Sequence, residues 1–373
     1  MPTPAITALA VEFPAGVRTN SCWLDTAGGD TRSETEAAPF VRLLASAESA
    51  PPDRIFDEER APYLADPFRG ARERRVLAEG EGTLDLETRA VRALLAARGA
   101  SPADVDAWMV SSFVADTLGA QNAAYLTRRL GVSAPAWNYE STCTSSVVGL
   151  QTASALVRSG EYERVAVVVS IGSSRLLGPG DSLARFLGDG AAAFLVEPAA
   201  DEGGVLASSV IGTPESCDAF RCELARDERD GRPVVRWRVG DPEAGRSMRD
   251  NAGDQLRRCV GEALRKAGHG IDEVDFFVFN TPVAWFAAFA ARSLGVSQDR
   301  TMSVYERYAN IGAVLTPACL FHAAREGRVR RGDLVVLFAV GSVSTAGAIV
   351  LRWGDTALGP EPAPGVPLTG ARS

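Results

Sequence analysis

The chain has 373 residues, a hydrophobic content of 46% and a formal net charge of −8, so it is long enough for one large domain or two of about 190 residues. The acidic balance without a block of Lys or Arg argues against a nucleic-acid-binding protein, and we find neither a signal-peptide pattern nor an apolar run long enough to span a membrane. The six cysteines contain no CxxC pair, which predicts reduced thiols, a cytoplasmic location and no structural metal site.

Strand-like and helix-like segments alternate along the chain. The segments with helical periodicity, each of which closes on a glycine, are 83–99, 147–160 and 314–327. Continuous apolar runs rich in Val, Ile and Phe predict strands that are buried on both faces. These runs are 164–171, 192–197, 275–280, 333–340 and 346–353. The alternation predicts an α/β layered fold, and the Pro- and Gly-rich residues 356–373 predict a disordered tail.

One internal repeat divides the chain. The segment VDAWMVSS, from Val105, resembles VDFFVFNT, from Val274. In the same order, CTSSVVGLQTASALVRSG, from Cys143, resembles NIGAVLTPACLFHAAREG, from Asn310. This alignment places Cys143 and Asn310 at equivalent positions, each between a strand and a buried helix. If the halves pack about a pseudo-twofold axis, Asn310 lies near Cys143. The repeat therefore predicts two similar α/β halves, which span 1–198 and 199–355.

Cys143 lies between two threonines, directly before an apolar helix. A helix N-terminus carries about half a positive charge and free N–H groups, which stabilise a thiolate. Cysteines in such places have pKa values well below the ordinary value of about 8.5. The position therefore predicts a reactive nucleophile with a lowered pKa. The alternative is a small buried core residue, which is the common role of a cysteine before an apolar helix.

Several motifs that occur together point to a known family. They are GARERRV (70–76), CTSSVVGL (143–150), FLGDGAAAFLVE (186–197), YANIGAVLTPA (308–318) and GDLVVLFAVGSVSTAGAIVLRW (332–353). In these motifs the chain resembles the thiolase superfamily, most closely the ketoacyl-ACP synthase III-like enzymes. The resemblance implies an α/β, five-layered α-β-α-β-α fold made of two duplicated halves. It also implies a homodimer and an acyltransferase that uses a Cys-His-Asn triad and no cofactor other than an acyl thioester.

The resemblance assigns roles to three residues. Cys143 matches the nucleophile that accepts the acyl group. Asn310 matches the triad asparagine, although an asparagine at a helix start is often only an N-cap. Gly341, in AVGSVS, matches the glycine whose N–H joins that of the cysteine in the oxyanion hole.

The triad histidine is missing from its expected place. The matching strand reads DFFVFNTPVAW, and the histidine position falls on Asn280. An amide donates hydrogen bonds to an oxyanion or orients a carbonyl, but it does not shuttle a proton; the alternative is a turn residue. The two histidines of the chain lie elsewhere, and we interpret His269 as a surface residue and His322 as a packing residue.

Two carboxylates are candidates for the missing base. Glu140 ends the strand before Cys143, and buried carboxylates have raised pKa values suited to proton transfer. The alternative for Glu140 is an ion pair at a dimer interface. Asp116, in the loop FVADTLG, is favoured as a loop cap over a base.

The sequence predicts an acyltransferase or condensing enzyme of specialised metabolism, such as polyketide or antibiotic biosynthesis. The acyl donor is an acyl-carrier protein or an acyl-CoA. The segment RAPYLADPFRGARERR lacks the tryptophan common in CoA-using members, so it does not favour CoA over a carrier protein. The acceptor is a small molecule that receives the acyl group on carbon, oxygen or nitrogen. The alternative is a non-catalytic partner subunit of a heterodimeric condensing enzyme.

Overall fold

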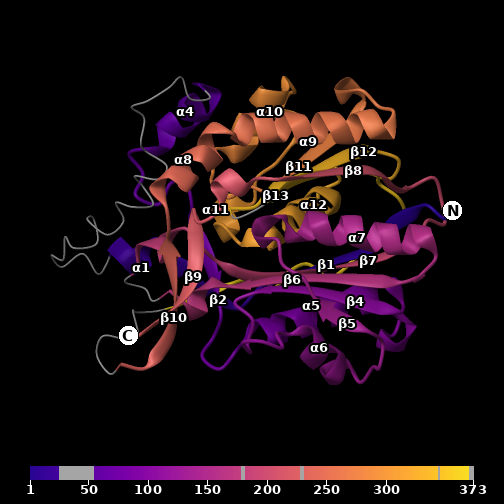
Figure 1. Ribbon diagram of the computed structural model, residues 1–373, viewed down its shortest axis with the longest axis horizontal. Helices are drawn as coiled ribbons and strands as arrows, with labels where there is room; N and C mark the ends of the chain where they lie inside the picture. The colour runs from indigo at the N-terminus through magenta and orange to yellow at the C-terminus, as the bar shows by residue number, and fades with distance from the viewer. Residues whose placement is uncertain (25–53, 178–180, 227–230, 343–344, 369–373) are drawn as a thin grey trace.

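The computed structural model places two β-sheets between and beside layers of helices (Figure 1). It describes residues 1–24, 54–177, 181–226, 231–342 and 345–368. Helices α5 and α6 cover the outer face of the first sheet, and α9 and α10 cover the outer face of the second. Helices α7 and α12 lie between the sheets (Figure 1). This is the five-layered α-β-α-β-α fold that the sequence predicts.

The main helices have these bounds: α4 Arg54–Arg60, α5 Thr83–Arg98, α6 Ala123–Leu130, α7 Ser145–Ser159, α8 Pro242–Asp250, α9 Ala252–Ala267, α10 Phe286–Leu294 and α12 Leu315–Arg325. Two single-turn helices are α1 Ser21–Leu24 and α11 Tyr305–Tyr308. Helices α5, α6, α7, α9 and α10 end on a glycine in the left-handed conformation, which caps the last carbonyl groups at no steric cost.

The first sheet has the strand order β14-β1-β7-β6-β4-β5 and the second has the order β11-β12-β13-β8. The strands of the first sheet are β1 Pro4–Glu12, β4 Ala107–Phe113, β5 Ala136–Asn138, β6 Val165–Gly172, β7 Asp189–Pro198 and β14 Ala357–Leu358. Those of the second are β8 Gly204–Gly212, β11 Phe276–Phe279, β12 Leu334–Val340 and β13 Thr345–Arg352. Every residue of β6 and β12 is buried, as their continuous apolar sequences predict.

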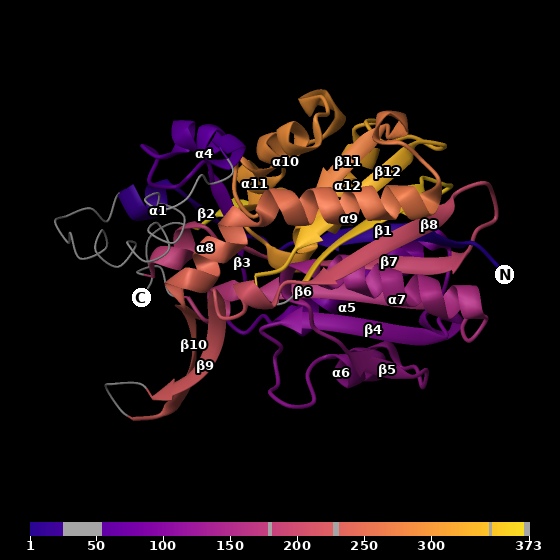
Figure 2. The same ribbon diagram turned by 45° about the horizontal axis from the view of Figure 1, so that its top comes forward.

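The remaining strands form two small sheets. Strands β2 Gly16–Thr19, β3 Glu73–Val76 and β15 Val366–Pro367 form one, and the hairpin of β9 Phe220–Arg226 and β10 Pro233–Val239 forms the other. The hairpin extends away from the layered body (Figure 2). Its base lies against the body, since Trp237 packs on Phe113 with ring centroids 5.0 Å apart.

The C-terminal residues are ordered as far as the structure describes them, so the predicted disordered tail is wrong for 356–368. Strand β14 pairs with β1, and β15 pairs with β2. Arg75 Nη2 also donates to the carbonyl of Ala363 at 3.1 Å. Proline and glycine do not prevent order here because neighbouring strand edges supply the hydrogen bonds. Residues 369–373 lie outside the described residues.

The duplication is visible in the order of the strands. Strands β1, β7, β6 and β4 of the first sheet correspond to β8, β13, β12 and β11 of the second. Helices α7 and α12 follow matching 3₁₀ turns, Thr142–Thr144 and Gly312–Val314, which contact each other. The boundary predicted at residue 198 falls between β7 and β8.

The matched turns correct the alignment of the repeat. Thr142 and Gly312 open the two turns with φ values of 50° and 54°. This pairing makes Ala313 the counterpart of Cys143, and Glu140 the counterpart of Asn310. The prediction that Cys143 and Asn310 are equivalent is therefore wrong. Sequence similarity misplaced the register because both segments are short and rich in small residues.

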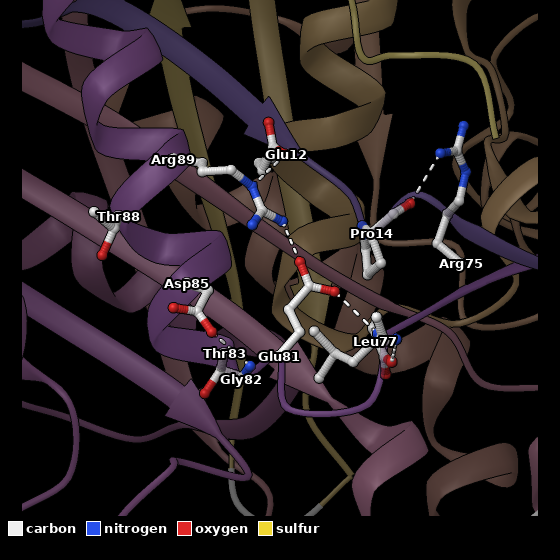
Figure 3. A network of polar contacts seen from close by, with 12 residues as sticks. Glu12, Pro14, Arg75, Leu77, Glu81, Gly82, Thr83, Asp85, Thr88 and Arg89 are labelled. Carbon is white, nitrogen blue, oxygen red and sulfur yellow. Dashed lines mark hydrogen bonds and ion pairs between the residues drawn. The ribbon is translucent and has the colours of Figure 1, made fainter. Parts of the chain in front are cut away.

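An arginine joins the start of α5 to the first sheet. Arg89 Nε donates to Glu12 at 2.8 Å and Arg89 Nη2 donates to Glu81 at 2.6 Å, so its guanidinium lies between two carboxylates (Figure 3). Asp85 accepts from the N–H of Gly82 at 2.8 Å and caps the helix. These contacts fix α5, whose buried face carries Glu87, against the sheet.

Candidate active site

A mostly apolar cavity of about 120 Å³ lies where the two halves meet. Its apolar wall includes Phe56, Phe113, Ile171, Phe220, Trp237 and Phe286. Its polar lining residues are Thr142, Cys143, Asn310, Ser342 and Arg249. The structure therefore brings two of the predicted site residues, Cys143 and Asn310, to one cavity, and each comes from a different half.

A strained turn presents Cys143 to the cavity. Thr142 has a φ of 50°, a left-handed conformation that costs a β-branched residue of order 1–3 kcal/mol. The surroundings hold this turn, because Glu140 Oε1 accepts the N–H of Thr142 at 2.5 Å and Thr144 Oγ1 donates to the carbonyl of Thr345 at 3.0 Å. Cys143 follows in the 3₁₀ turn and is half-buried. Strain of this kind at a cavity is typical of a functional residue.

The backbone N–H groups of Cys143 and Ser342 lie close enough to the Cys143 sulfur to favour its thiolate and lower the pKa of the thiol. The N–H of Gly341 instead donates to the carbonyl of Thr345 at 2.8 Å. Gly341 is therefore not the donor that the sequence predicts, and Ser342 stands in that position. The glycine supplies space instead, because a Cβ there would lie 2.5 Å from Thr142 Oγ1 and 2.9 Å from the Ser141 carbonyl oxygen.

The structure contradicts the prediction of a lowered pKa for Cys143. Burial, together with the nearby charge of Glu140, raises the pKa of this thiol to about 12. The N–H groups of Cys143 and Ser342 oppose this effect without overcoming it. Burial destabilises the thiolate by more than the positive end of α7 stabilises it, because the helix dipole is equivalent to only about half an elementary charge. A thiol with a raised pKa is mostly protonated at neutral pH, so nucleophilic attack by Cys143 would need a proton acceptor.

The amide of Asn310 has a fixed orientation. Its Oδ1 accepts the N–H of Gly312 at 2.9 Å, which leaves Nδ2 as the donor that the side chain offers to the cavity. Backbone hydrogen bonds to Phe186 and Gly188, at 2.9 and 3.0 Å, hold the residue in place. The arrangement suits a group that donates to a substrate carbonyl.

Glu140 makes the same contact as its counterpart Asn310. Each accepts the N–H of the residue two positions later, Thr142 in one half and Gly312 in the other. Ser111 and Ser145 hydroxyls also donate to Glu140, each at 3.3 Å. Burial of the carboxylate raises its pKa. Glu140 does not line the cavity.

Asn280 is fully buried directly after β11, and its backbone N–H donates to the carbonyl of Phe338 at 2.9 Å. Neither Oδ1 nor Nδ2 has a hydrogen-bond partner. The next residues, Pro282 and Val283, line the cavity, whereas Asn280 does not. The amide thus lies behind the cavity wall, and leaving it unpaired costs about 1–3 kcal/mol.

Both histidines have the structural roles that the sequence predicts. His322 is buried, and its Nε2 lies 3.0 Å from the hydroxyl of Tyr308. Burial lowers the pKa of His322 to about 4. His269 lies in a surface loop with its Nδ1 3.1 Å from Glu273. Neither lines the cavity.

Asp116 is a cap, as predicted. Its carboxylate oxygens accept the N–H groups of Thr83 and Leu84, the first two residues of α5, at 3.0 and 3.1 Å. The cavity-lining residues that sequence reasoning missed are Ser342 and Arg249. Only Ser342 had a signal in the sequence, its place beside the motif glycine.

Comparison with known proteins identifies the family. The model of the 3-oxoacyl-[acyl-carrier-protein] synthase III C-terminal domain matches residues 264–353, and that of 3-oxoacyl-[acyl-carrier-protein] synthase III matches 138–214. The thiolase N-terminal domain model matches 72–173. β-Ketoacyl-[acyl-carrier-protein] synthase III of Sphingopyxis alaskensis is 32% identical over 288 residues, which are 76% of this chain and 88% of that protein. This chain belongs to the ketoacyl-ACP synthase III-like family of the thiolase superfamily.

Other comparisons agree with this family of acyl-transferring condensing enzymes. The corresponding protein of Chelativorans sp. is 28% identical over 76% of this chain and 88% of its own length. The solved structure of the synthase (FabH) from Thermus thermophilus is 26% identical, covers 94% of this chain and 99% of its own, and has a TM-score of 0.73. Cerulenin-bound OleA of Xanthomonas campestris, 18% identical over 94% of this chain and 97% of its own with a TM-score of 0.71, shares the fold.

No helix among the described residues is long and apolar enough to cross a membrane. No group of three or more His, Cys, Asp and Glu side chains among them is placed to hold a metal ion.

Proposed function

We propose that the protein forms an acyl thioester on Cys143 and passes the acyl group to a second substrate, with formation of a C–C, ester or amide bond. The observation that carries the proposal is the placement of Cys143 on an apolar cavity with two N–H groups at its sulfur and Asn310 in the wall. An apolar cavity suits an acyl chain, and paired N–H groups suit an oxyanion.

The first half-reaction transfers the acyl group to the enzyme. The sulfur of Cys143 loses its proton and attacks the thioester carbonyl carbon. The resulting oxyanion accepts hydrogen bonds from the N–H groups of Cys143 and Ser342, each of which is worth about 10²–10³ in rate. The donor C–S bond then breaks, and the departing thiolate takes up the proton. We propose Glu140 as the group that carries this proton, because its negative charge is close enough to raise the pKa of the Cys143 thiol.

The second half-reaction passes the acyl group to the acceptor. Nδ2 of Asn310 would hold the carbonyl of the acyl group or of the acceptor. Asn280 is the amide at the position that histidine occupies in family members, where histidine and asparagine stabilise an enolate formed by decarboxylation. Because Asn280 moves no proton, we propose a divergent transfer or condensation in specialised metabolism, of the polyketide or antibiotic type.

The proposal is tested by intact-mass analysis after incubation with a panel of acyl-CoAs and acyl-carrier proteins. We expect the mass of one acyl group, located on Cys143 by peptide mapping. Cys143→Ala should abolish the addition, and Cys217→Ala, at an exposed cysteine, should retain it. Asn310→Ala should slow transfer to acceptors by about 10²-fold or more.

Acylation of another cysteine would contradict the proposal. The absence of any acylation in a folded protein, across all donors, would favour the alternative of a non-catalytic partner subunit in a heterodimer.

A further inference from the structure

Among the described residues that line this mostly apolar cavity, one has a charged side chain, Arg249 at the end of α8. Its side chain is only 4% exposed. Nε and Nη2 donate to Asp250 at 2.8 and 2.7 Å. A guanidinium is costly to bury, and an acyl chain of hydrocarbon alone gives it nothing to bind.

A second arginine lies behind this wall. Arg60 ends α4, and its side chain is 7% exposed. Nη2 lies 3.0 Å from Asp57 Oδ1, whereas Nε and Nη1 are buried with no hydrogen-bond partner. Phe56, one turn earlier on the buried face of α4, lines the cavity. Arg60 thus lies on the same buried face of α4 as a cavity-lining residue.

The two guanidinium groups lie close enough to repel each other. Burial lowers the pKa of Arg60, and the charges of Arg249 and Arg69 lower it further. Asp57 acts in the opposite direction. Buried donors of a charged group are almost always paired, and leaving them unpaired is costly. An anionic group of a substrate would relieve both the unpaired donors and the mutual repulsion.

We propose that Arg60 and Arg249 form an anion subsite at the α4–α8 end of the cavity. The subsite recognises a carboxylate or phosphate carried by a substrate whose body is apolar. The inference rests on the proposed function, because it assigns a substrate class to the same cavity. Charge-assisted hydrogen bonds in a largely desolvated site are strong enough for a preference of about 10- to 100-fold.

The test compares acyl donors that differ in one group. N-acetylcysteamine thioesters carry no phosphate. Comparing the acylation rates of Cys143 with the succinyl and butyryl N-acetylcysteamine thioesters therefore isolates the effect of the carboxylate at equal acyl chain length. Butyryl-CoA against the butyryl N-acetylcysteamine thioester isolates the phosphates. We expect one of these pairs to show acylation of Cys143 about 10- to 100-fold faster for the anionic member.

The variants Arg249→Met and Arg60→Met keep side-chain length and remove charge, and each should bring the rate ratio toward one. Arg246→Met is the matched control on the same helix, because Arg246 is 39% exposed and pairs only loosely with Glu243 at 3.7 Å. Its ratio should equal that of the unchanged protein. Equal rates within both pairs, or an equal effect of Arg246→Met, would overturn the subsite.

A binding measurement separates this inference from the proposed function. Glutarate and inorganic phosphate, added separately, should raise the melting temperature of the unchanged protein, and Arg60→Met should remove the shift for the anion that binds. If Cys143 is never acylated but this shift is found, the subsite stands and the proposed function fails. If neither anion gives a shift and acylation shows no preference, the subsite fails and the proposed function stands.

Discussion

Burial and the charge of Glu140 raise the pKa of the Cys143 thiol. Because Glu140 contributes to this pKa through its negative charge, Glu140→Gln should lower the pKa. The alkylation rate of Cys143 against pH, followed by peptide mass spectrometry, should have its midpoint above the ordinary value of about 8.5, and the midpoint should fall in the variant.

The same substitution should act in the opposite direction on catalysis. If Glu140 carries the proton from the thiol, Glu140→Gln slows self-acylation at neutral pH by about 10²-fold or more, although the thiol has become more acidic. A variant that alkylates at lower pH and also acylates faster would contradict the role of Glu140 as base.

The unpaired amide of Asn280 leads to a second residue-level prediction. Leu has nearly the same shape without the polar atoms, so Asn280→Leu removes a desolvation cost of about 1–3 kcal/mol. We expect the variant to unfold at a higher urea concentration and to transfer its acyl group to acceptors more slowly, with self-acylation less affected. A variant that is destabilised by several kcal/mol would show that the amide is paired in solution.

At the scale of elements, Glu87 links four of them. It lies on α5 and accepts hydrogen bonds from Ser112 on β4 and Ser170 on β6, both at 2.6 Å. Asn122, which precedes α6, donates to it at 3.0 Å. Burial raises the pKa of Glu87 from 4.5 to about 7, and the charge of Asp116 adds to this.

This pKa predicts how stability depends on pH. Between pH 4.5 and about 7 the folded chain keeps a proton on Glu87 that the unfolded chain has lost. This contribution to the free energy of unfolding is therefore complete below the window and falls as pH rises through it, by at most about 1.4 kcal/mol per pH unit. Glu87→Gln should flatten this part of the profile in urea titrations, whereas Glu79→Gln, at an exposed position, should not. An unchanged slope in Glu87→Gln would refute the assignment.

Part of the fold and of the candidate site was predictable from the sequence. Buried strands, helix ends and the duplication were predictable, because they depend on local pattern and on motif order. Motif order also predicted that Cys143 and Asn310 lie together, and both line one cavity. The thiol pKa was not, since desolvation depends on what packs around Cys143 in three dimensions. The N–H near the sulfur was assigned one residue too early, because the N–H of Gly341 donates to Thr345 and that of Ser342 acts on the thiol. The direction of an N–H alternates along an extended chain, and a sequence motif does not show it.

At the scale of the whole molecule, one edge of the first sheet is open to a further strand, as far as the structure describes the chain. In the first sheet, β5 is the last strand, so one of its edges has no partner within the described residues. The N–H of Tyr139 and the carbonyl of Pro135 bond to β4, and alternation directs the N–H and C=O groups of Ala136 outward. Nearby, the loop Val114–Gly119 exposes Leu118 to 78%. An unpaired edge beside an exposed apolar side chain is a natural surface for a second copy.

We therefore predict a homodimer in which β5 pairs with the same strand of a second copy and the loop Val114–Gly119 reaches the neighbour's pocket. Sedimentation at micromolar concentration should show the dimer. Ala136→Pro removes an outward N–H, and Leu118→Asp replaces about 1.5–3 kcal/mol of apolar burial with a charge, so each should weaken dimerisation at least 10-fold. Leu224→Asp is the matched control, because Leu224 is 74% exposed on the hairpin strand β9. A monomer in the unchanged protein, or equal weakening by Leu224→Asp, would rule out this interface.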